Sequence, residues 1–238
     1  MSKESKYKII EKSILQDIKE NRLKLGDQIP TEIELCKVFN TSRMTVNKAI
    51  TSLVSRGYIK RVSGKGSFVN KQFIEKSLKK IPRSFTEDMK SIGMVAGATL
   101  LEYKILRGVQ LDDDIREKLQ VSENELVHFF SRLRTGDGII FAISYDYVPC
   151  KTLATINPSK LEGSFFEYVK ENNLEIGSAT ITITATLPTK EQKQFLKIDN
   201  EALLKVSHIT ELTDGRILEY IDTYYIGSMY SYKSYIDK

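Results

Sequence analysis

The sequence predicts a two-domain α+β protein, with a winged helix-turn-helix at the N-terminus and an antiparallel β-sheet with helices after it. Residues 28–69 contain two helical stretches, a polar break between them and a basic hairpin with two glycines. Beyond residue 83, several stretches alternate apolar and polar residues, which is the period of β-strands. A chain of 238 residues has the length of two ordinary domains.

Capping residues delimit the two helices of the first domain. Thr31, with a glutamate three residues later, is typical of a capping box and begins a helix over residues 31–39. Ser42 can accept a hydrogen bond from the first free N–H groups of a second helix over residues 43–56. Gly57 then supplies the left-handed backbone that ends this helix.

The second helix has an apolar and a polar face. Residues at i, i+3, i+4 and i+7 form the apolar stripe: Val46, Ala49, Ile50 and Leu53. The polar face carries Arg43, Met44, Asn47, Lys48 and Thr51. In an arbitrary amphipathic helix such a face is simply solvated. The tight turn before this helix and the hairpin after it instead favour a recognition helix in the major groove of duplex DNA.

The hairpin over residues 59–69 has the composition of a DNA-binding wing. Lys60, Arg61 and Lys65 can meet phosphates, and Gly64 and Gly66 let the backbone approach a groove closely. An ordinary solvated hairpin is the alternative. We expect DNA contact because the two helices and the hairpin occur together and in order.

Charge is concentrated in the first domain. Residues 1–70 hold 14 Lys and Arg against 7 Asp and Glu, a net charge of +7, whereas the whole chain carries +5 and the remainder therefore −2. This distribution favours attraction to the phosphate backbone at one end of the molecule. We expect a DNA-binding domain over 1–70, an ordered or semi-ordered linker over 71–82 and a second domain over 83–238.

Predicted elements of the second domain alternate between strands and short helices. Strands are expected over 100–106, 126–134, 139–148, 179–187, 203–212 and 217–225. Helices are expected over 87–92, 112–119, 161–172 and 190–196. Turn sequences at 135–138 and 213–215 join two strand pairs into hairpins. This order predicts an antiparallel sheet with helices packed on one side.

A weak internal repeat lies in the second domain. At a constant offset of 77 residues, a helix end, a polar elbow and a β-hairpin recur: Leu119/Leu196, Val121/Ile198, Leu126/Leu203, Asp137/Asp214, Ile140/Ile217 and Tyr147/Tyr224. Two such units in one sheet would be related by a pseudo-two-fold, with a cleft between them. Two similar hairpins by chance are the alternative.

Two arginines of this domain suggest an anion site. Arg132 and Arg134 lie two apart on a predicted strand, so both side chains leave the same face. They can pair with acidic neighbours or converge on a phosphate or carboxylate. Ser84 and Glu87 form a second capping box, at a helix start whose free N–H groups can also bind an anion, although a plain cap is the alternative.

Several classes of protein are not expected. Cys36 and Cys150 lack metal or disulfide spacing, and His128 and His208 both fall in predicted strands. No catalytic set, metal motif or phosphate-binding glycine loop is present, so we expect no enzyme, metal or cofactor. The polar N-terminus and the lack of a long apolar run predict a cytoplasmic protein without membrane contact.

The first domain resembles the winged helix-turn-helix of the GntR superfamily of bacterial transcription regulators. The resemblance rests on residues 26–30, 42–46, 57–59 and 64–69. It implies that Arg43 reaches base edges, that Ser42 and Thr45 touch phosphate and that Gly64 lies at the minor groove. With these four, the residues expected to contact DNA are Thr31, Asn47, Lys48, Arg61, Lys65 and Gly66. Ile33 and Asn47 stand where arginines are common in the family. Since Arg43 can pair with guanine and Asn47 with adenine, we expect an operator with a relaxed demand for guanine at one position.

The second domain resembles the UTRA effector-binding domain, the chorismate-lyase-like fold of HutC-type GntR regulators. The similar segments are residues 84–90, 93–94, 131–134, 137–138 and 218–225. Some members of this family sense phosphorylated amino sugars, and the resemblance assigns their contacts to positions of this sequence. The phosphate contacts correspond to Phe85, Thr86, Arg132 and Arg134, and the sugar contacts to Glu219 and Tyr225. Ser178 is a further candidate, and Ser144 stands at the place of a second glutamate.

Together these features predict a cytoplasmic, bacterial, homodimeric repressor, associated with the nucleoid when bound. A small anionic effector would control whether the protein binds or releases its double-stranded DNA operator. Sugar phosphates are one class of such effectors. The alternative is an architectural DNA-binding protein without an effector, which would bind DNA independently of sequence and ligand.

Overall fold

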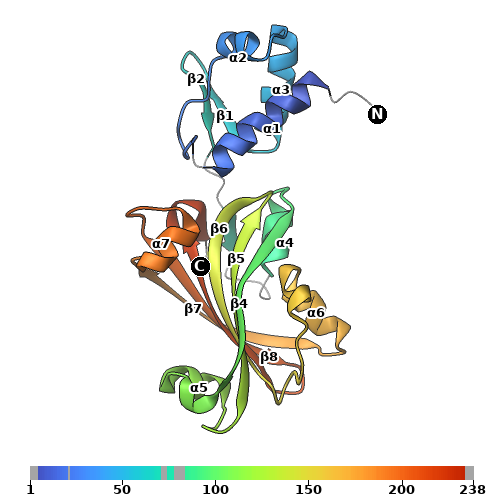
Figure 1. Cartoon of the computed structure of the whole chain (residues 1–238), viewed down its shortest axis with the longest axis vertical. Helices are drawn as coiled ribbons and strands as arrows, with labels where there is room; N and C mark the ends of the chain where they lie inside the picture. Colours follow the sequence, from blue (N-terminus) through green and yellow to red (C-terminus); the bar gives the residue numbers. More distant parts are fainter. Residues whose placement is uncertain (1–4, 21, 71–73, 78–83, 234–238) are drawn as a thin grey trace, which may run out of the picture. The chain divides into compact units, whose positions relative to one another are not determined.

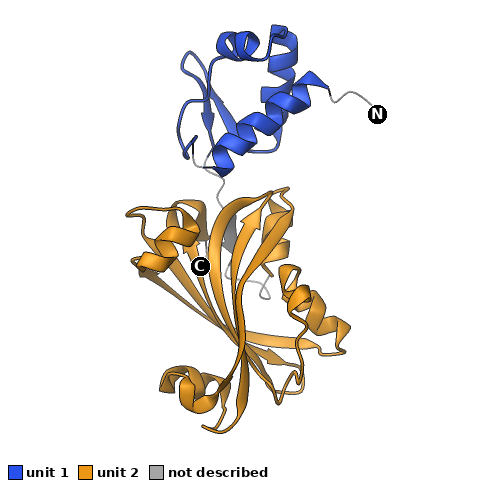
Figure 2. Ribbon diagram, viewed as in Figure 1, with its two compact units in different colours: residues 1–73 blue, residues 74–238 orange. Residues whose placement is uncertain are grey.

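The computed structural model describes residues 5–20, 22–70, 74–77 and 84–233 and divides into two compact units. The units comprise Met1–Phe73 and Ile74–Lys238 (Figure 2). Their boundary falls inside the segment expected to be a linker. Within that segment Ile74–Ser77 form a short strand, β3, of the second unit, whereas residues 71–73 and 78–82 lie outside the described residues.

The first unit contains three helices and a two-stranded hairpin, the architecture of a winged helix-turn-helix. Its elements are α1 (Lys6–Lys19), α2 (Glu32–Val38), α3 (Arg43–Ser55), β1 (Ile59–Val62) and β2 (Gly66–Val69). Both expected caps are present: Thr31 forms a reciprocal capping box with Glu34, and the Ser42 hydroxyl accepts a hydrogen bond from Thr45 N. The apolar stripe of α3 is buried. The sequence did not delimit α1, which packs on α3 through Ile10, Ile14 and Ile18.

The second unit is built on a six-stranded antiparallel sheet. Its strands are β4 (Ala96–Arg107), β5 (Leu126–Gly136), β6 (Ile139–Pro149), β7 (Ile176–Thr186), β8 (Leu203–Leu212) and β9 (Ile217–Ile226). Their spatial order is β4-β5-β6-β9-β8-β7. All six strands were expected from the alternation, with ends that differ by up to four residues.

The sheet order divides this unit into two similar halves. Strands β4, β5 and β6 form one half, and β7, β8 and β9 form the other, with β6 and β9 paired at the centre. The helices repeat in the same way: α4 (Phe85–Ser91) and α5 (Asp113–Leu119) accompany the first half, and α6 (Phe165–Glu171) and α7 (Lys190–Leu196) the second. The two hairpins of the repeat therefore belong to one sheet and occupy equivalent places in its two halves.

Helices cover both faces of the sheet, and not one face as expected from the sequence. Helix α6 packs with Phe130 and Leu218 on one face, whereas α5 packs with Val127 and Tyr220 on the other (Figure 1). The expectation was wrong because burial does not alternate along β5 and β9. Most of their residues are buried on both faces of the sheet, so both faces must be covered.

A short parallel pair completes the second unit. Strand β3 pairs with β10 (Tyr230–Lys233), which follows directly after β9 and a 3₁₀ turn over Gly227–Met229. Strand β10 also contacts α4: Asp88 of α4 accepts a hydrogen bond from the Tyr230 hydroxyl at 3.1 Å. Helix α4 and β10 are thus joined by a buried polar contact.

Candidate functional site

A cavity opens on the face of the sheet that α4 and α6 cover. Its volume is about 60 Å³, where one water needs roughly 10–15 Å³, so it has room for several water molecules or a small ligand group. The lining residues come from α4, α6 and four strands: Ser84, Phe85, Thr86, Arg132, Arg134, Ser144, Asp146, Ser164, Phe165, Phe166, His208, Glu219, Ile221, Thr223 and Tyr225. Both halves of the repeat contribute, as a cleft between two related units requires.

Arg132 is held by a buried carboxylate. Its Nη2 donates to Asp146 Oδ1 at 2.8 Å, and the two side chains are 3% and 0% exposed. Nη1 donates to the Leu161 carbonyl at 3.4 Å. The second oxygen of Asp146 accepts a hydrogen bond from the Ser144 hydroxyl at 2.8 Å. These contacts fix the guanidinium plane of Arg132 and cancel its charge inside the protein.

Arg134 lies beside this pair but has no such partner. It is 6% exposed, its Nε is buried without an acceptor, and it forms no hydrogen bond or ion pair with any residue that the structure describes. Its guanidinium lies 4.6 Å from the centre of the Phe85 ring. Burial, and next the charge of Arg132, lower the pKa of Arg134 to about 9, so it remains charged at neutral pH. A buried cation without a counter-ion among the described residues is energetically costly, and an anion beside it would offset that cost.

Glu219 faces the same cavity and is largely protonated at neutral pH. Its Oε1 accepts a hydrogen bond from the Thr210 hydroxyl at 3.2 Å, while its Oε2 is buried without a hydrogen-bond partner among the described residues. Burial, and next the carboxylate of Asp146, raise the pKa of Glu219 to about 8, although the nearby arginines oppose this. A protonated carboxyl group can donate a hydrogen bond to a ligand oxygen.

The structure brings most of the expected effector residues together. Phe85 and Thr86 line the cavity from the first turn of α4, Ser144 from β6, and Tyr225 from β9. Tyr225 is buried and stacks on Tyr230 with ring centres 3.8 Å apart. Burial raises the pKa of its hydroxyl, so the phenol stays neutral and can donate a hydrogen bond.

Ser178 does not join this group. It lies exposed on β7, does not line the cavity, and its hydroxyl donates to Glu211 at 3.2 Å. Because β7 is an edge strand, Ser178 lies at the edge of the sheet and outside the residues that line the cavity. Its part in effector binding stays a prediction.

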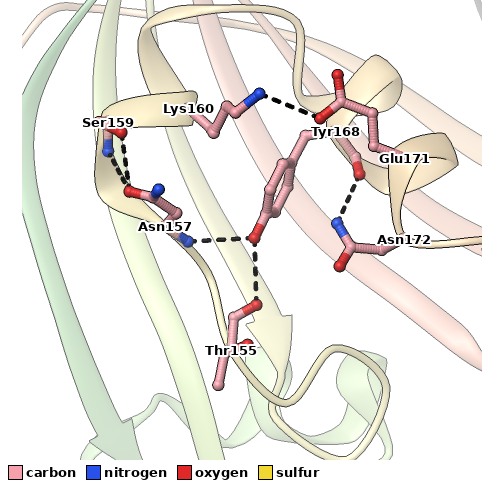
Figure 3. Close-up of polar contacts among 7 residues, drawn as sticks. All are labelled: Thr155, Asn157, Ser159, Lys160, Tyr168, Glu171 and Asn172. Carbon is pink, nitrogen blue, oxygen red and sulfur yellow. Dashed lines mark hydrogen bonds and ion pairs between the residues drawn. The ribbon is translucent and has the colours of Figure 1, made fainter.

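Helix α6 forms a braced wall of the cavity. The Tyr168 hydroxyl accepts from Asn157 N at 3.2 Å and donates to the Thr155 carbonyl at 3.4 Å, which ties α6 to the preceding loop (Figure 3). Lys160 and Glu171 add an exposed ion pair across the same segment. These contacts fix the position from which Ser164, Phe165 and Phe166 enter the cavity.

Sequence reasoning missed several lining residues. Asp146 was detectable, because it lies two residues after Ser144 and therefore on the same face of the strand. His208 likewise lies in a predicted strand. Ser164, Phe165 and Phe166 were missed because the helix was placed over 161–172. The signal was present, since Ser164 is followed three residues later by a glutamate, as Thr31 and Ser84 are.

In the first unit the expected DNA-contacting residues lie on the surface. Thr45 is half-buried, and the others are exposed: Thr31, Ser42, Arg43, Asn47, Lys48, Arg61, Gly64, Lys65 and Gly66. Met44, next to Arg43 on α3, is 85% exposed. The wing turns at Gly64 and Gly66, whose positive φ angles of 72° and 115° favour glycine.

Glu32 links the recognition helix to the wing and was not foreseen. Its Oε1 lies 3.5 Å from both Asn47 Nδ2 and Arg61 Nη2. Lys48 lies over the ring of Tyr7 at 4.3 Å from its centre. The polar groups of α3 and β1 are therefore oriented by neighbours in the first unit.

Comparison with protein families identifies both units. The family described as "Bacterial regulatory proteins, gntR family" matches residues 6–69, and the UTRA domain matches residues 91–231. This chain belongs to the GntR family. A GntR chain with a UTRA domain is a HutC-type transcription regulator with a DNA-binding head, and not an enzyme.

Relatives of this GntR regulator are similar over nearly their whole length. It is 30% identical to the HTH-type transcriptional repressor NagR of Bacillus subtilis over 234 residues, 98% of this chain and 94% of NagR. It is 30% identical to the probable fructoselysine utilization operon transcriptional repressor of Escherichia coli K12 over 206 residues, covering 85% and 83% of the two chains.

A solved structure has the same fold. PhnF from Mycobacterium smegmatis matches with a TM-score of 0.64 and 21% identity, over 94% of this regulator and 98% of PhnF. In the part of the chain that the structure describes, no helix has both the length and the apolar character to cross a membrane.

Proposed function

We propose that this regulator is a repressor that binds a two-fold operator as a homodimer and responds to a small anionic metabolite bound in the cavity of its second unit. The observation that carries the effector half is Arg134. A buried guanidinium without a partner among the described residues is costly, and an anionic ligand would remove that cost.

The charged, hydrogen-bonding and aromatic side chains of the cavity indicate which class of ligand would bind there. Arg134 supplies a cation, Glu219 and Tyr225 supply neutral hydrogen-bond donors, and Phe85 supplies an aromatic surface. A metabolite with one acidic group and several hydroxyls matches this set. Sugar phosphates and sugar acids are both members of that class, and the names of the relatives, with sugar-related operons among them, support it.

The DNA half rests on the exposed face of α3 and on the wing. Arg43, Asn47 and Lys48 face solvent from the start of α3, where a recognition helix contacts base edges. Half-sites of such proteins lie about 34 Å or a multiple apart, so a dimer is needed to contact both. A ligand that changes the spacing of two heads would then release the operator. Analytical ultracentrifugation of the full chain should give twice the chain mass. A monomer bound to operator DNA would refute the homodimer.

A direct experiment combines ligand screening with DNA release. Thermal shifts of the full chain would be measured against sugar phosphates, sugar acids, amino acids and short carboxylates. An operator selected from random duplexes would then be used in fluorescence anisotropy, with and without the metabolite that gives the largest shift. Wild-type protein should release the duplex, whereas Arg134→Ala should bind it equally well and fail to release it.

Arg216→Ala is the matched control. Arg216 lies in the same unit but is exposed and bonded to Asp214, away from the cavity. This variant should respond as the wild type does. A normal effector response of Arg134→Ala would refute the cavity as the effector site, and no preference for any duplex over random competitor would refute the repressor.

A further inference from the structure

The cavity has less net charge than its ionisable side chains suggest. Arg132 and Asp146 form a buried ion pair and cancel each other. Glu219 is largely protonated at neutral pH because burial raises its pKa to about 8. Burial raises the pKa of the Tyr225 phenol, which is therefore neutral. Among the arginines, carboxyl groups and the phenol that line the cavity, Arg134 therefore contributes a net charge of about +1.

Asp146 is fixed in its role as the counter-ion of Arg132. One of its oxygens accepts from Arg132 and the other from Ser144, both at 2.8 Å, and its side chain is 0% exposed. Arg132 is held from its other side by the Leu161 carbonyl. A ligand that drew Arg132 away would leave the carboxylate of Asp146 buried and without its cation, which is strongly unfavourable.

We propose that Asp146 sets the charge of the effector, so that the cavity prefers a singly charged acidic group, such as a carboxylate or a sulfate ester, to a doubly charged phosphate monoester. This inference rests on the proposed function, because it assumes that the cavity is the effector site. It goes further by assigning selectivity to Asp146, which contacts Arg132 and not Arg134, the arginine that would bind the ligand.

The physical reason is the cost of a surplus charge away from water. A single negative charge next to Arg134 neutralises it, and a planar carboxylate can accept two parallel hydrogen bonds from the guanidinium. A dianion at the same place leaves one negative charge uncompensated beside the carboxylate of Asp146. In a partly desolvated cavity that repulsion is several times larger than in water.

Perrhenate and molybdate provide a direct test. Both are tetrahedral oxyanions of nearly the same size, but perrhenate carries one negative charge and molybdate two at neutral pH. Their affinities for the full chain would be measured by calorimetry at about pH 7.2 and constant ionic strength. Anomalous scattering from soaked crystals would locate each ion. Wild-type protein should bind perrhenate next to Arg134 at least about tenfold more tightly than molybdate.

Two variants separate charge from shape. Asp146→Asn adds a second uncompensated cation, so the preference should shift towards molybdate by about tenfold or more. Because a lone buried Arg132 can prevent folding, a second variant replaces the pair together, Arg132→Met with Asp146→Leu. Exchanging both members of a buried pair for apolar residues is often neutral for stability. This double variant keeps only the charge of Arg134 and should retain the preference for perrhenate.

The outcomes distinguish the two proposals. Stronger binding of molybdate than of perrhenate at this site in wild-type protein would overturn the inference about Asp146 while leaving an anion site. An unchanged ratio in a folded Asp146→Asn variant, or a reversed ratio in the double variant, would overturn it as well. If neither ion bound near Arg134, the cavity would not be an anion site, and the effector half of the proposed function would fail with it.

Discussion

Arg134 lies over the face of Phe85, with its guanidinium carbon 4.6 Å from the ring centre. This contact joins β5 of the sheet to the first turn of α4, between two residues that lie 49 positions apart in the chain. It also shields the cation from water without neutralising it. The position of α4 and the readiness of Arg134 to bind an anion are therefore linked through one aromatic ring.

Phe85→Leu should weaken effector binding. Leucine keeps an apolar side chain but loses the cation–π contact, which contributes about 0.5–2 kcal/mol, and hence the affinity should fall roughly 2- to 30-fold. Calorimetry with the effector, or with perrhenate, would measure this. Phe85→Tyr keeps the ring and should bind almost as the wild type does. Equal affinities for all three proteins would mean that the ring does not position Arg134.

Glu219→Gln should reduce the dependence of stability on pH. The folded protein holds the Glu219 proton with a pKa raised to about 8, against an ordinary value of 4.5. A raised carboxyl pKa contributes stability that is complete below about pH 4.5 and is lost as the pH rises to about 8. Glutamine has no proton to lose. The free energy of unfolding of the variant should therefore fall less than that of the wild type between about pH 5 and pH 8.5.

Urea unfolding at a series of pH values would measure the effect. Glu162→Gln, a change at an exposed carboxylate after Leu161, serves as the control and should follow the wild-type curve. If wild type and Glu219→Gln lost stability in parallel, Glu219 would be ionised in the folded protein, and the net charge of the cavity would be near zero.

Strands and caps were predictable from local sequence, whereas the cavity's charge balance was not. The helix starts at Thr31, Ser42 and Ser84 could be predicted because a capping hydroxyl accepts a hydrogen bond from an N–H group only three residues later. The pairing of Arg132 with Asp146 depends on the register between β5 and β6, where Arg132 lies opposite Ser144. Register of this kind is set by the whole hairpin and cannot be read from one strand.

The layers of the second unit show the same limit. Strand β5 buries nearly every residue from Val127 to Arg134, so its alternation gave the strand but not the side on which each helix packs. The short strands β3 and β10 were missed because they have four residues each and pair only with one another. Their pairing joins residues 74–77 to residues 230–233, which are far apart in the sequence, so neither segment alone predicts it.

Gly108→Ala should destabilise the second unit. A Cβ at Gly108 would lie 2.9 Å from the Ser122 carbonyl carbon and still closer to its oxygen, and this backbone cannot move away as a side chain can. Overpacking of this kind costs about 1–3 kcal/mol. At Gly163, by contrast, the nearest atom to a new Cβ is the Lys160 carbonyl oxygen at 3.4 Å. Chemical denaturation should show a loss for Gly108→Ala and little change for Gly163→Ala; equal stabilities would mean that the loop at Ser122 is adaptable.

Asn47→Arg should change which base the recognition helix prefers. Asn47 is exposed on α3, where its amide lies 3.5 Å from Glu32 and its oxygen accepts from Thr51. Asparagine pairs with adenine and arginine with guanine, and each good pair contributes about 1–3 kcal/mol of discrimination. Selection from random duplexes should therefore recover guanine at one position of each half-site.

The wing supplies the contrasting variant. Lys65 lies at the exposed tip between β1 and β2, where we expect it to contact phosphate and not a base edge. Lys65→Ala should lower affinity for all sequences alike and reduce the slope of log affinity against log salt by about 1. A base preference that Asn47→Arg left unchanged would exclude Asn47 from the readout. A changed preference in Lys65→Ala would show that the wing, and not only α3, reads the bases.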